Sequence, residues 1–295
     1  MEDLKHYESK LSKEGQDAYK ILLRGLSNHQ DIIVIPTVLP PEDSYSVAAA
    51  VDFDNPQLYF VNFNALEFVH FNEPGTLSCW GIKGAYYMSE EECAKIDEVM
   101  IDEIIGILTE SLKEASIESR YWKLYNWLLK RCSTGWCREY EEYFPNAASS
   151  LIGPLLLEET MCEGYAKAFK LLCDKVNEML PADQCYECIV ASEYDDAGNE
   201  NSLGHAWNTM IKDDTEWLHC DLAKEPDDEE RHGRYFMISE EELHRKWMID
   251  DDSEMAATVL TKQDSMDRNS HVVISGNIYI NGDVNLFINS FRSGR

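Results

Sequence analysis

The chain has few basic residues for its length and no long hydrophobic run. Lysine and arginine number 26 against 55 aspartates and glutamates, which gives a formal net charge of −29. Nucleic-acid binding needs clustered Lys and Arg to neutralise phosphates, and anionic membranes attract the same residues. No stretch approaches the roughly 18 apolar residues of a transmembrane helix. We therefore expect neither a nucleic-acid partner nor a membrane partner.

A signal-peptide core and a disulfide pattern are also missing. Residues 1–5 begin a charged amphipathic segment, without the apolar centre of a signal peptide. Nine cysteines, an odd number in 295 residues, do not suit a disulfide framework. Both features favour a reducing, cytoplasmic location. A signal peptide removed beforehand would reverse this expectation.

Hydrophobic periodicity predicts an α+β fold. Hydrophobic residues are 44% and charged residues 27% of the chain, an ordinary globular mixture. Apolar residues recur at helical spacing in one segment, 160–180, and three strand-like segments follow it. A helix followed by antiparallel strands argues against a doubly wound sheet. Further helices are expected at 8–27, 40–50, 89–115, 119–132 and 239–247, and strands at 186–192, 205–212 and 216–222.

Three regions follow from this pattern. Residues 1–117 form a mostly helical N-terminal region with an extended stretch at 57–71 and loops marked by Gly75, Gly81 and Gly84. Residues 118–255 form the core. Residues 256–295 combine a polar linker with strand-like segments around two turns, which could form a β appendage or a strand for homo-oligomerisation.

The sequence around Cys162 suggests a nucleophile. Thr160 and Glu163 have the spacing of a capping box, which places Cys162 at the second position of a helix. A thiol beside the free N–H groups of a helix N-terminus is biased toward thiolate. Gly164 costs about 1 kcal/mol in a helix, and could permit close approach of the backbone by a substrate or a packed neighbour.

A thiolate of this kind needs a base, and His205 is the best candidate. It begins an alternating segment that turns near Asp213 and returns through Asp221. The two side chains share a face of such a hairpin only if the connection has an odd number of residues, for example 212–214. A two-residue turn would point Asp221 away from His205.

Three segments of the chain resemble the signature motifs of the bacterial transglutaminase-like superfamily. They read Thr-Met-Cys-Glu-Gly-Tyr around Cys162, Gly-His-Ala-Trp-Asn around His205, and Trp-Leu-His-Cys-Asp ending at Asp221. The resemblance covers roughly the first 250 residues and is strongest over 150–250. It implies a papain-like fold with the cysteine helix packed on an antiparallel sheet. It further implies Cys162 as nucleophile, His205 as general base and acid, and Asp221 as the carboxylate that orients the histidine.

Other residues have a possible role beside a structural one. The candidate substrate-binding residues are Trp207, Gly164 and Trp136. Trp207 shares a face with His205 and could also shield it from water. Trp136 could line a substrate groove. Ordinary packing is the alternative for each. His219 lies on the face of Asp221 and is a rival base of lower weight. Cys173, on the apolar helix face, is expected to be an inert core thiol, as are Cys93, Cys132 and Cys220.

No metal or cofactor is expected. Cys185 and Cys188 form a single Cys-x-x-Cys, and zinc needs about four ligands. The acidic segment 225–230 is expected to be a solvated loop and not a calcium site.

The preferred function is thiol-dependent acyl transfer or hydrolysis at amide bonds of a peptide or protein, as in a peptidase, a transferase or a deamidase. The alternative is a papain-like scaffold without catalytic activity, used for binding or assembly. A metalloenzyme is a third option that no ligand cluster supports.

Overall fold

The described residues form two compact units. The computed structural model describes residues 5–36, 39, 41–71, 79–140, 142–193, 205–212, 215–226, 229 and 232–250. One unit ends at Glu90 and the other begins at Glu91. The C-terminal β segment expected at 256–295 lies outside the described residues. The boundaries expected after residues 117 and 255 stay predictions.

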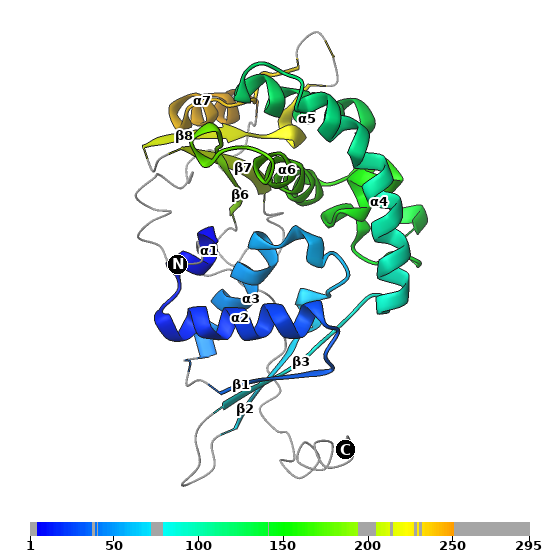
Figure 1. Ribbon diagram of the computed structural model, residues 1–295, viewed down its shortest axis with the longest axis vertical. Helices are drawn as coiled ribbons and strands as arrows, with labels where there is room; N and C mark the ends of the chain where they lie inside the picture. Colours follow the sequence, from blue (N-terminus) through cyan, green and yellow to red (C-terminus); the bar gives the residue numbers. More distant parts are fainter. Residues whose placement is uncertain are drawn as a thin grey trace. The chain divides into compact units, whose positions relative to one another are not determined.

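The first unit combines three helices with a three-stranded antiparallel sheet (Figure 1). The strand order is β1-β3-β2, so the central strand is the last in sequence. The prediction of a loop at Gly81 is wrong, because this glycine lies in the central strand and pairs with both neighbours. The elements are α1 (His6–Lys10), α2 (Lys13–Ser27), β1 (Ile32–Ile35), α3 (Pro41–Asp54), β2 (Glu67–Phe71) and β3 (Cys79–Lys83).

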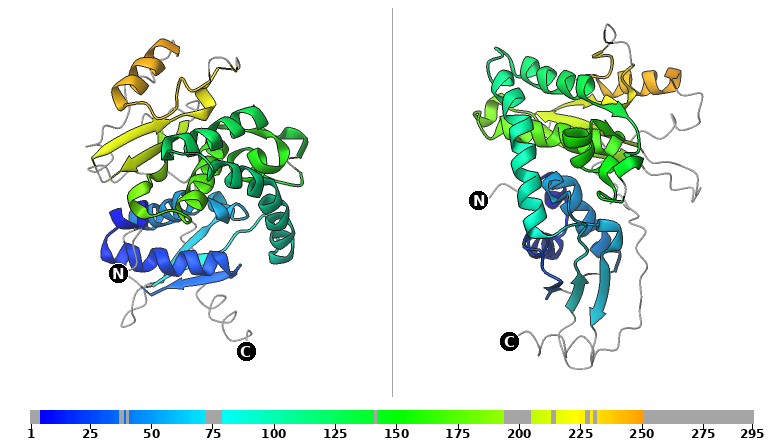
Figure 2. Two further views of the ribbon diagram at one scale, coloured as in Figure 1. Left: turned by 45° about the horizontal axis from the view of Figure 1, so that its top comes forward. Right: turned by 90° about the vertical axis from the view of Figure 1, so that its right-hand side faces the viewer.

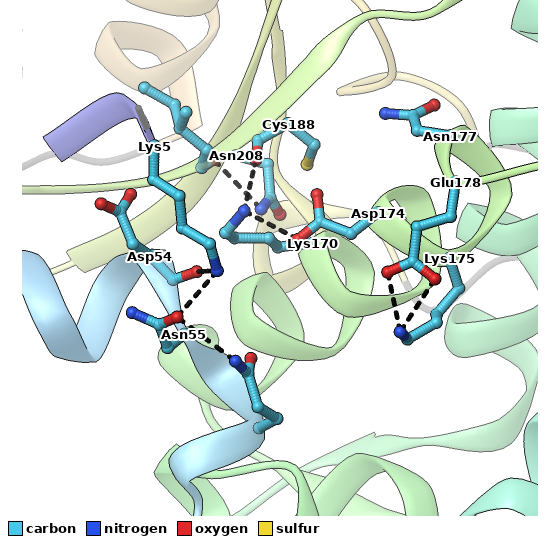
Figure 3. Close-up of polar contacts among 12 residues, drawn as sticks. Lys5, Asp54, Asn55, Lys170, Asp174, Lys175, Asn177, Glu178, Cys188 and Asn208 are labelled. Atoms are coloured by element: carbon cyan, nitrogen blue, oxygen red, sulfur yellow. Dashed lines mark hydrogen bonds and ion pairs between the residues drawn. The ribbon is translucent and has the colours of Figure 1, made fainter. Parts of the chain in front are cut away.

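The stretch expected to be extended at 57–71 is only partly so. Two 3-10 turns, η1 (Pro56–Leu58) and η2 (Phe63–Ala65), precede β2. Side-chain bonds fasten the start of the chain to the end of α3, as Figure 3 shows. The Lys5 ammonium donates to the Asp54 carbonyl at 3.0 Å and to Asn55 Oδ1 at 2.7 Å. Asn55 Nδ2 in turn donates to the Tyr19 hydroxyl at 2.8 Å.

The second unit carries the residues that the sequence marked as functional. Its main sheet is antiparallel with the order β6-β7-β8, and a short parallel pair, β4 and β5, precedes the central helix. This mixture of helices and antiparallel sheet is compatible with the predicted α+β class. No helix in the described part of the chain has the length and apolar character needed to cross a membrane. The elements are α4 (Glu90–Ser111), α5 (Ile117–Arg131), β4 (Ser133–Thr134), β5 (Glu159–Thr160), α6 (Cys162–Asn177), β6 (Glu187–Glu193), β7 (His205–Lys212), β8 (Glu216–Cys220) and α7 (Glu240–Asp250).

Two helices cover opposite faces of the β6-β7-β8 sheet. Helix α6 lies on one face and α7 on the other (Figures 1 and 2). On the α6 face, Asn208 Nδ2 donates to the Ala166 carbonyl at 2.9 Å and so joins the middle strand to the helix. On the α7 face, Leu243 and Trp247 pack with Trp207 in one buried cluster. The sheet is therefore enclosed on both sides around its central strand.

A buried lysine adds a second polar link between α6 and the sheet. The Lys170 ammonium pairs with Asp174 at 2.9 Å and donates to the Cys188 carbonyl at 3.1 Å (Figure 3). Lys175, on the same helix, pairs with Glu178 at 2.8 Å but reaches no other element in that view. Only the first of these ion pairs ties the helix to the sheet.

Candidate active site

Cys162 is the first residue of α6, but no capping box places it there. Met161 occupies the N-cap position and makes no side-chain cap bond. The Thr160 hydroxyl donates to the Ala148 carbonyl at 2.9 Å, and Glu163 pairs with Lys167 at 2.8 Å. The predicted box is therefore wrong, because both of its side chains have tertiary or helical partners. Cys162 still lies where the N–H groups of the first turn have no partner within the helix.

Gly164 fills a position without room for a side chain. A Cβ atom there would lie 2.2 Å from Thr160 Oγ1 and 2.4 Å from the Ala148 carbonyl oxygen. Contacts this short are below any normal separation between heavy atoms. Close packing of the segment before the helix therefore explains the glycine. A contact between Gly164 and substrate stays a prediction.

The β7–β8 hairpin has the odd connection that a shared face requires. Lys212 pairs with Glu216, and three residues separate them. Thr209 pairs with His219, and Asn208 with Cys220. Continuing this register by one residue brings Asp221 opposite Trp207. The expected connection of 212–214 is thus off by one residue, but His205 and Asp221 still share a face.

His205 lies between an acid and the candidate nucleophile. Its Nε2 atom is 2.8 Å from Asp221 Oδ2, and the Asp221 side chain is fully buried. The Cys162 side chain is close enough to the His205 ring to raise its pKa. Since Asp221 occupies Nε2, the nitrogen left for the thiol is Nδ1. The structure therefore brings together the three residues that the sequence marked as nucleophile, base and orienting carboxylate.

The pKa of His205 is raised. Burial of the ring lowers this pKa, but the charge of Asp221 and its hydrogen bond work in the opposite direction. Cys162 contributes in the same direction as Asp221, and together they raise the pKa of His205 from 6.5 to about 10. The imidazole is therefore protonated at neutral pH, and a cation beside the sulfur stabilises a thiolate.

Two tryptophans enclose the His205–Asp221 pair. Trp207 stacks on His205 with ring centroids 6.1 Å apart, and the edge of Trp247 meets the same ring at 5.5 Å. Trp247 also donates its indole N–H to Asp221 Oδ2 at 3.2 Å. Trp207 is 3% and Trp247 5% exposed, so both keep water from the pair. The shielding expected of Trp207 fits this position, whereas sequence reasoning missed Trp247.

His219 is not placed to act as the base. Its Nδ1 atom receives the indole N–H of Trp207 at 3.3 Å and lies 3.1 Å from the Thr209 hydroxyl. An indole N–H can only donate, so Nδ1 is unprotonated and the ring is neutral. Burial and the charge of His244 lower the pKa of His219 to about 4. The face of the sheet thus holds one charged and one neutral histidine.

Trp136 lies on a segment beside the start of α6. Strand β4 pairs with β5 in parallel, and the Gly135 N–H continues this ladder by donating to the Thr160 carbonyl at 3.0 Å. Trp136 follows directly and is 50% exposed. This position leaves the indole accessible at the surface. A role in substrate binding stays a prediction.

Several other thiols lie in surroundings that disfavour a thiolate. Burial raises the pKa of Cys173 and Cys220 well above the ordinary value, and that of Cys132 to about 12. These directions agree with the expectation of inert core thiols. Within the described ranges, no group of three or more His, Cys, Asp or Glu side chains is arranged to hold a metal ion.

The expectation of a solvated acidic loop is wrong for Glu225. This residue follows the short 3-10 turn η7 (Leu222–Lys224), and its carboxylate accepts hydrogen bonds from Tyr125 and from three backbone N–H groups. Burial raises the pKa of Glu225, although the hydrogen bonds to the carboxylate oppose this. A glutamate in an acidic run gives no sequence signal for such surroundings.

Comparisons with known proteins give a weak structural likeness. No protein-family model matches the chain, and no curated protein matches its sequence. A solved structure described as a TGase is similar over 54% of this chain, with 14% sequence identity and a TM-score of 0.32. The chain covers 44% of the length of that structure. A likeness of this size carries no argument about activity.

Proposed function

We propose that this protein cleaves or exchanges amide bonds of a peptide or protein through a thioester on Cys162. The observation that carries the proposal is the position of the His205 ring between Asp221, at 2.8 Å, and the thiol of Cys162. A nucleophile within reach of a base that a third group orients is the arrangement of covalent catalysis. The proposed core is papain-like, of the transglutaminase-like kind that the sequence motifs resemble.

In the proposed reaction, the sulfur of Cys162 attacks the carbonyl carbon of an amide. The C–N bond breaks as the C–S bond persists, and His205 gives its proton to the departing amine. The N–H of Cys162, which has no partner within the helix, is available to the oxyanion. Water or a second amine then attacks the thioester, His205 takes its proton, and the thiolate is restored. Water gives an acid, and an amine gives a new amide.

Thiol labelling followed by acyl-enzyme trapping tests this proposal. Iodoacetamide at neutral pH should label Cys162 at least tenfold faster than Cys185, a partly exposed thiol whose pKa burial raises. The difference should disappear in His205→Ala. A panel of peptide amides, quenched in acid, should then add an acyl mass to the wild type and none to Cys162→Ala. Uniform slow labelling with no acyl adduct would favour a non-catalytic scaffold.

A further inference from the structure

A half-buried carboxylate outside the His205–Asp221 pair fixes the backbone next to it. Glu225 Oε1 accepts from the Tyr125 hydroxyl at 2.8 Å and from the Tyr235 N–H at 2.8 Å. Its other oxygen accepts from the N–H groups of Gly233 and Arg234, both at 3.1 Å. Four neutral donors thus converge on one acid. We name residues 233–235, with their three consecutive N–H groups, the cradle loop.

The cradle loop is bonded directly to Asp221. The Asp221 N–H donates to the Tyr235 carbonyl at 3.0 Å. Further along, His219 and Ile238 exchange two backbone hydrogen bonds of 2.8 and 3.0 Å. The segment after the cradle loop therefore lies along the end of β8 as an additional edge. Asp221 follows the last residue of β8, so this edge sets where its backbone lies.

The conformation of the cradle loop depends on a hydrogen-bond acceptor outside the loop. Gly233 has a φ of +90°, which favours glycine, and adding a Cβ there would bring it 3.0 Å from the Trp122 ring. Three consecutive N–H groups pointing to one side favour an acceptor there, because N–H groups shielded from water and left without a partner are costly, and Tyr235 is buried. Glu225 is that acceptor. Without its carboxylate, the loop would lose the acceptor of three of the hydrogen bonds that hold this conformation.

We propose that Glu225 is a positioning residue for the catalytic pair, acting through the cradle loop on Asp221 and through Asp221 on His205. The inference rests on the proposed function for its catalytic meaning. Its structural content is narrower: the Glu225 carboxylate determines how well Asp221 Oδ2 meets His205 Nε2. A glutamine has the same shape, but its NH2 group would point N–H donors at the Tyr125 hydroxyl or at the backbone N–H groups of the cradle loop, which are donors themselves.

The test measures the titration of His205 by NMR, on the full chain with labelled histidine rings. The His205 signal is assigned as the one that is missing from His205→Ala. Glu225→Gln should lower the titration midpoint of His205 by at least one pH unit in the folded protein. The matched control is Glu216→Gln. Glu216 accepts from the Tyr186 hydroxyl at 2.9 Å at the far end of β8, and this variant should keep the wild-type midpoint.

A loss of thermal stability in Glu225→Gln with an unchanged His205 midpoint would overturn the proposal, since that is the result of a merely structural role. If Glu225→Gln does not fold, Tyr125→Phe removes one of the four donors and should shift the midpoint in the same direction by a smaller amount. An unchanged midpoint in that variant would also overturn the proposal. The titration needs no substrate. A shifted midpoint without any trapped acyl-enzyme would therefore refute the proposed function and leave this inference standing.

Discussion

Asp221 lies diagonally across the hairpin from His205, and the register places it opposite Trp207. The paired residues of the hairpin, from Lys212 with Glu216 to Asn208 with Cys220, fix this offset. Diagonal neighbours on one face are about 7–8 Å apart, within reach of long or aromatic side chains. The His205 ring spans this diagonal with its Nε2 atom, which leaves Nδ1 at the opposite side of the ring for Cys162. A directly opposite pair would be closer and would leave less room for the imidazole.

The raised pKa of His205 makes protein stability depend on pH. A histidine whose folded pKa lies above its unfolded value stabilises the fold fully below the unfolded pKa, and this contribution is lost as the pH rises through the folded value. Here the range runs from 6.5 to about 10. Cys162 contributes to the upper value, so the range is narrower in a Cys162→Ala background. There we expect the free energy of unfolding to fall by about 1–2 kcal/mol between pH 7 and 9.

Adding Asp221→Asn to that background should at least halve this slope, because the carboxylate is the group that holds the proton on His205. Urea unfolding at several pH values measures both slopes. The double variant will be less stable at every pH, since the new amide group is buried, and the slopes alone are compared. Equal slopes would show that Asp221 does not control the His205 pKa.

Substitution of the two histidines on the sheet face should have different effects on the labelling rate of Cys162. His205→Gln should reduce the iodoacetamide labelling rate of Cys162 at neutral pH at least tenfold, because the cation beside the sulfur is lost. His219→Gln should leave the rate within twofold, because His219 is neutral and its Nδ1 is occupied by Trp207 and Thr209. A comparable loss in both variants would return His219 to the list of candidate bases.

Trp247→Phe removes the indole N–H that Asp221 receives while keeping an aromatic ring against His205. Losing one hydrogen bond to a buried carboxylate should cost about 1.5–3 kcal/mol of unfolding free energy. It should also lower the labelling rate of Cys162. Trp127→Phe is the control, since the Trp127 ring packs against the Arg131 guanidinium at 5.2 Å, a contact outside the triad and the cradle loop. Thermal unfolding and labelling report the two effects, and equal behaviour of the two variants would argue against a role for the indole N–H.

Gly164→Ala and Gly106→Ala should change stability in opposite directions. Alanine normally stabilises a helix by about 1 kcal/mol relative to glycine, and Gly106 has no atom within 4 Å of its added Cβ. Gly106→Ala should therefore raise the unfolding midpoint. Gly164→Ala should lower it, because the added carbon would lie 2.4 Å from the Ala148 carbonyl oxygen. A higher unfolding midpoint for Gly164→Ala would mean that the segment before α6 moves to accommodate the added carbon at little cost in free energy.

Lys170→Met and Lys175→Met compare two ion pairs of α6. Lys170 is 8% exposed and also bonds to the Cys188 carbonyl, whereas the Lys175 side chain is 42% exposed. We expect a loss of about 1–3 kcal/mol for Lys170→Met, since it leaves a buried carbonyl without its donor. Lys175→Met should change stability by less than about 0.5 kcal/mol. Denaturant unfolding measures both, and similar losses would contradict the assigned link to β6.

Pattern reasoning identified the elements that carry the site because each has a strong local signal. The 3.6-residue period marks α6, and alternation marks β7 and β8. The requirement for an odd connection also followed from the sequence, because only parity decides which face Asp221 shares. The diagonal placement of Asp221 relative to His205 did not follow from the sequence. No local feature distinguishes a connection centred on Asp213 from one centred on Asp214, and this change of one residue moves the partner of each β7 residue by two positions along β8.

Tertiary partners explain the other failures. The Thr160 hydroxyl bonds to Ala148, twelve positions earlier in sequence, so a capping box that looks complete locally does not form. Trp247 meets Asp221 from a helix 26 positions later. Glu225 stands in an acidic run that suggests full exposure, and its half-buried position depends on hydrogen bonds from Tyr125 and the cradle loop. None of these contacts leaves a periodic trace in the sequence.

The stacking of Trp207 on His205 gives the protein a built-in optical signal. A protonated imidazole quenches the fluorescence of an adjacent indole more strongly than a neutral one does. Trp207 and Trp247 both contact this ring, so their share of the emission of the seven tryptophans follows its charge. The protonation of the site can therefore be followed without any added dye or chemical label.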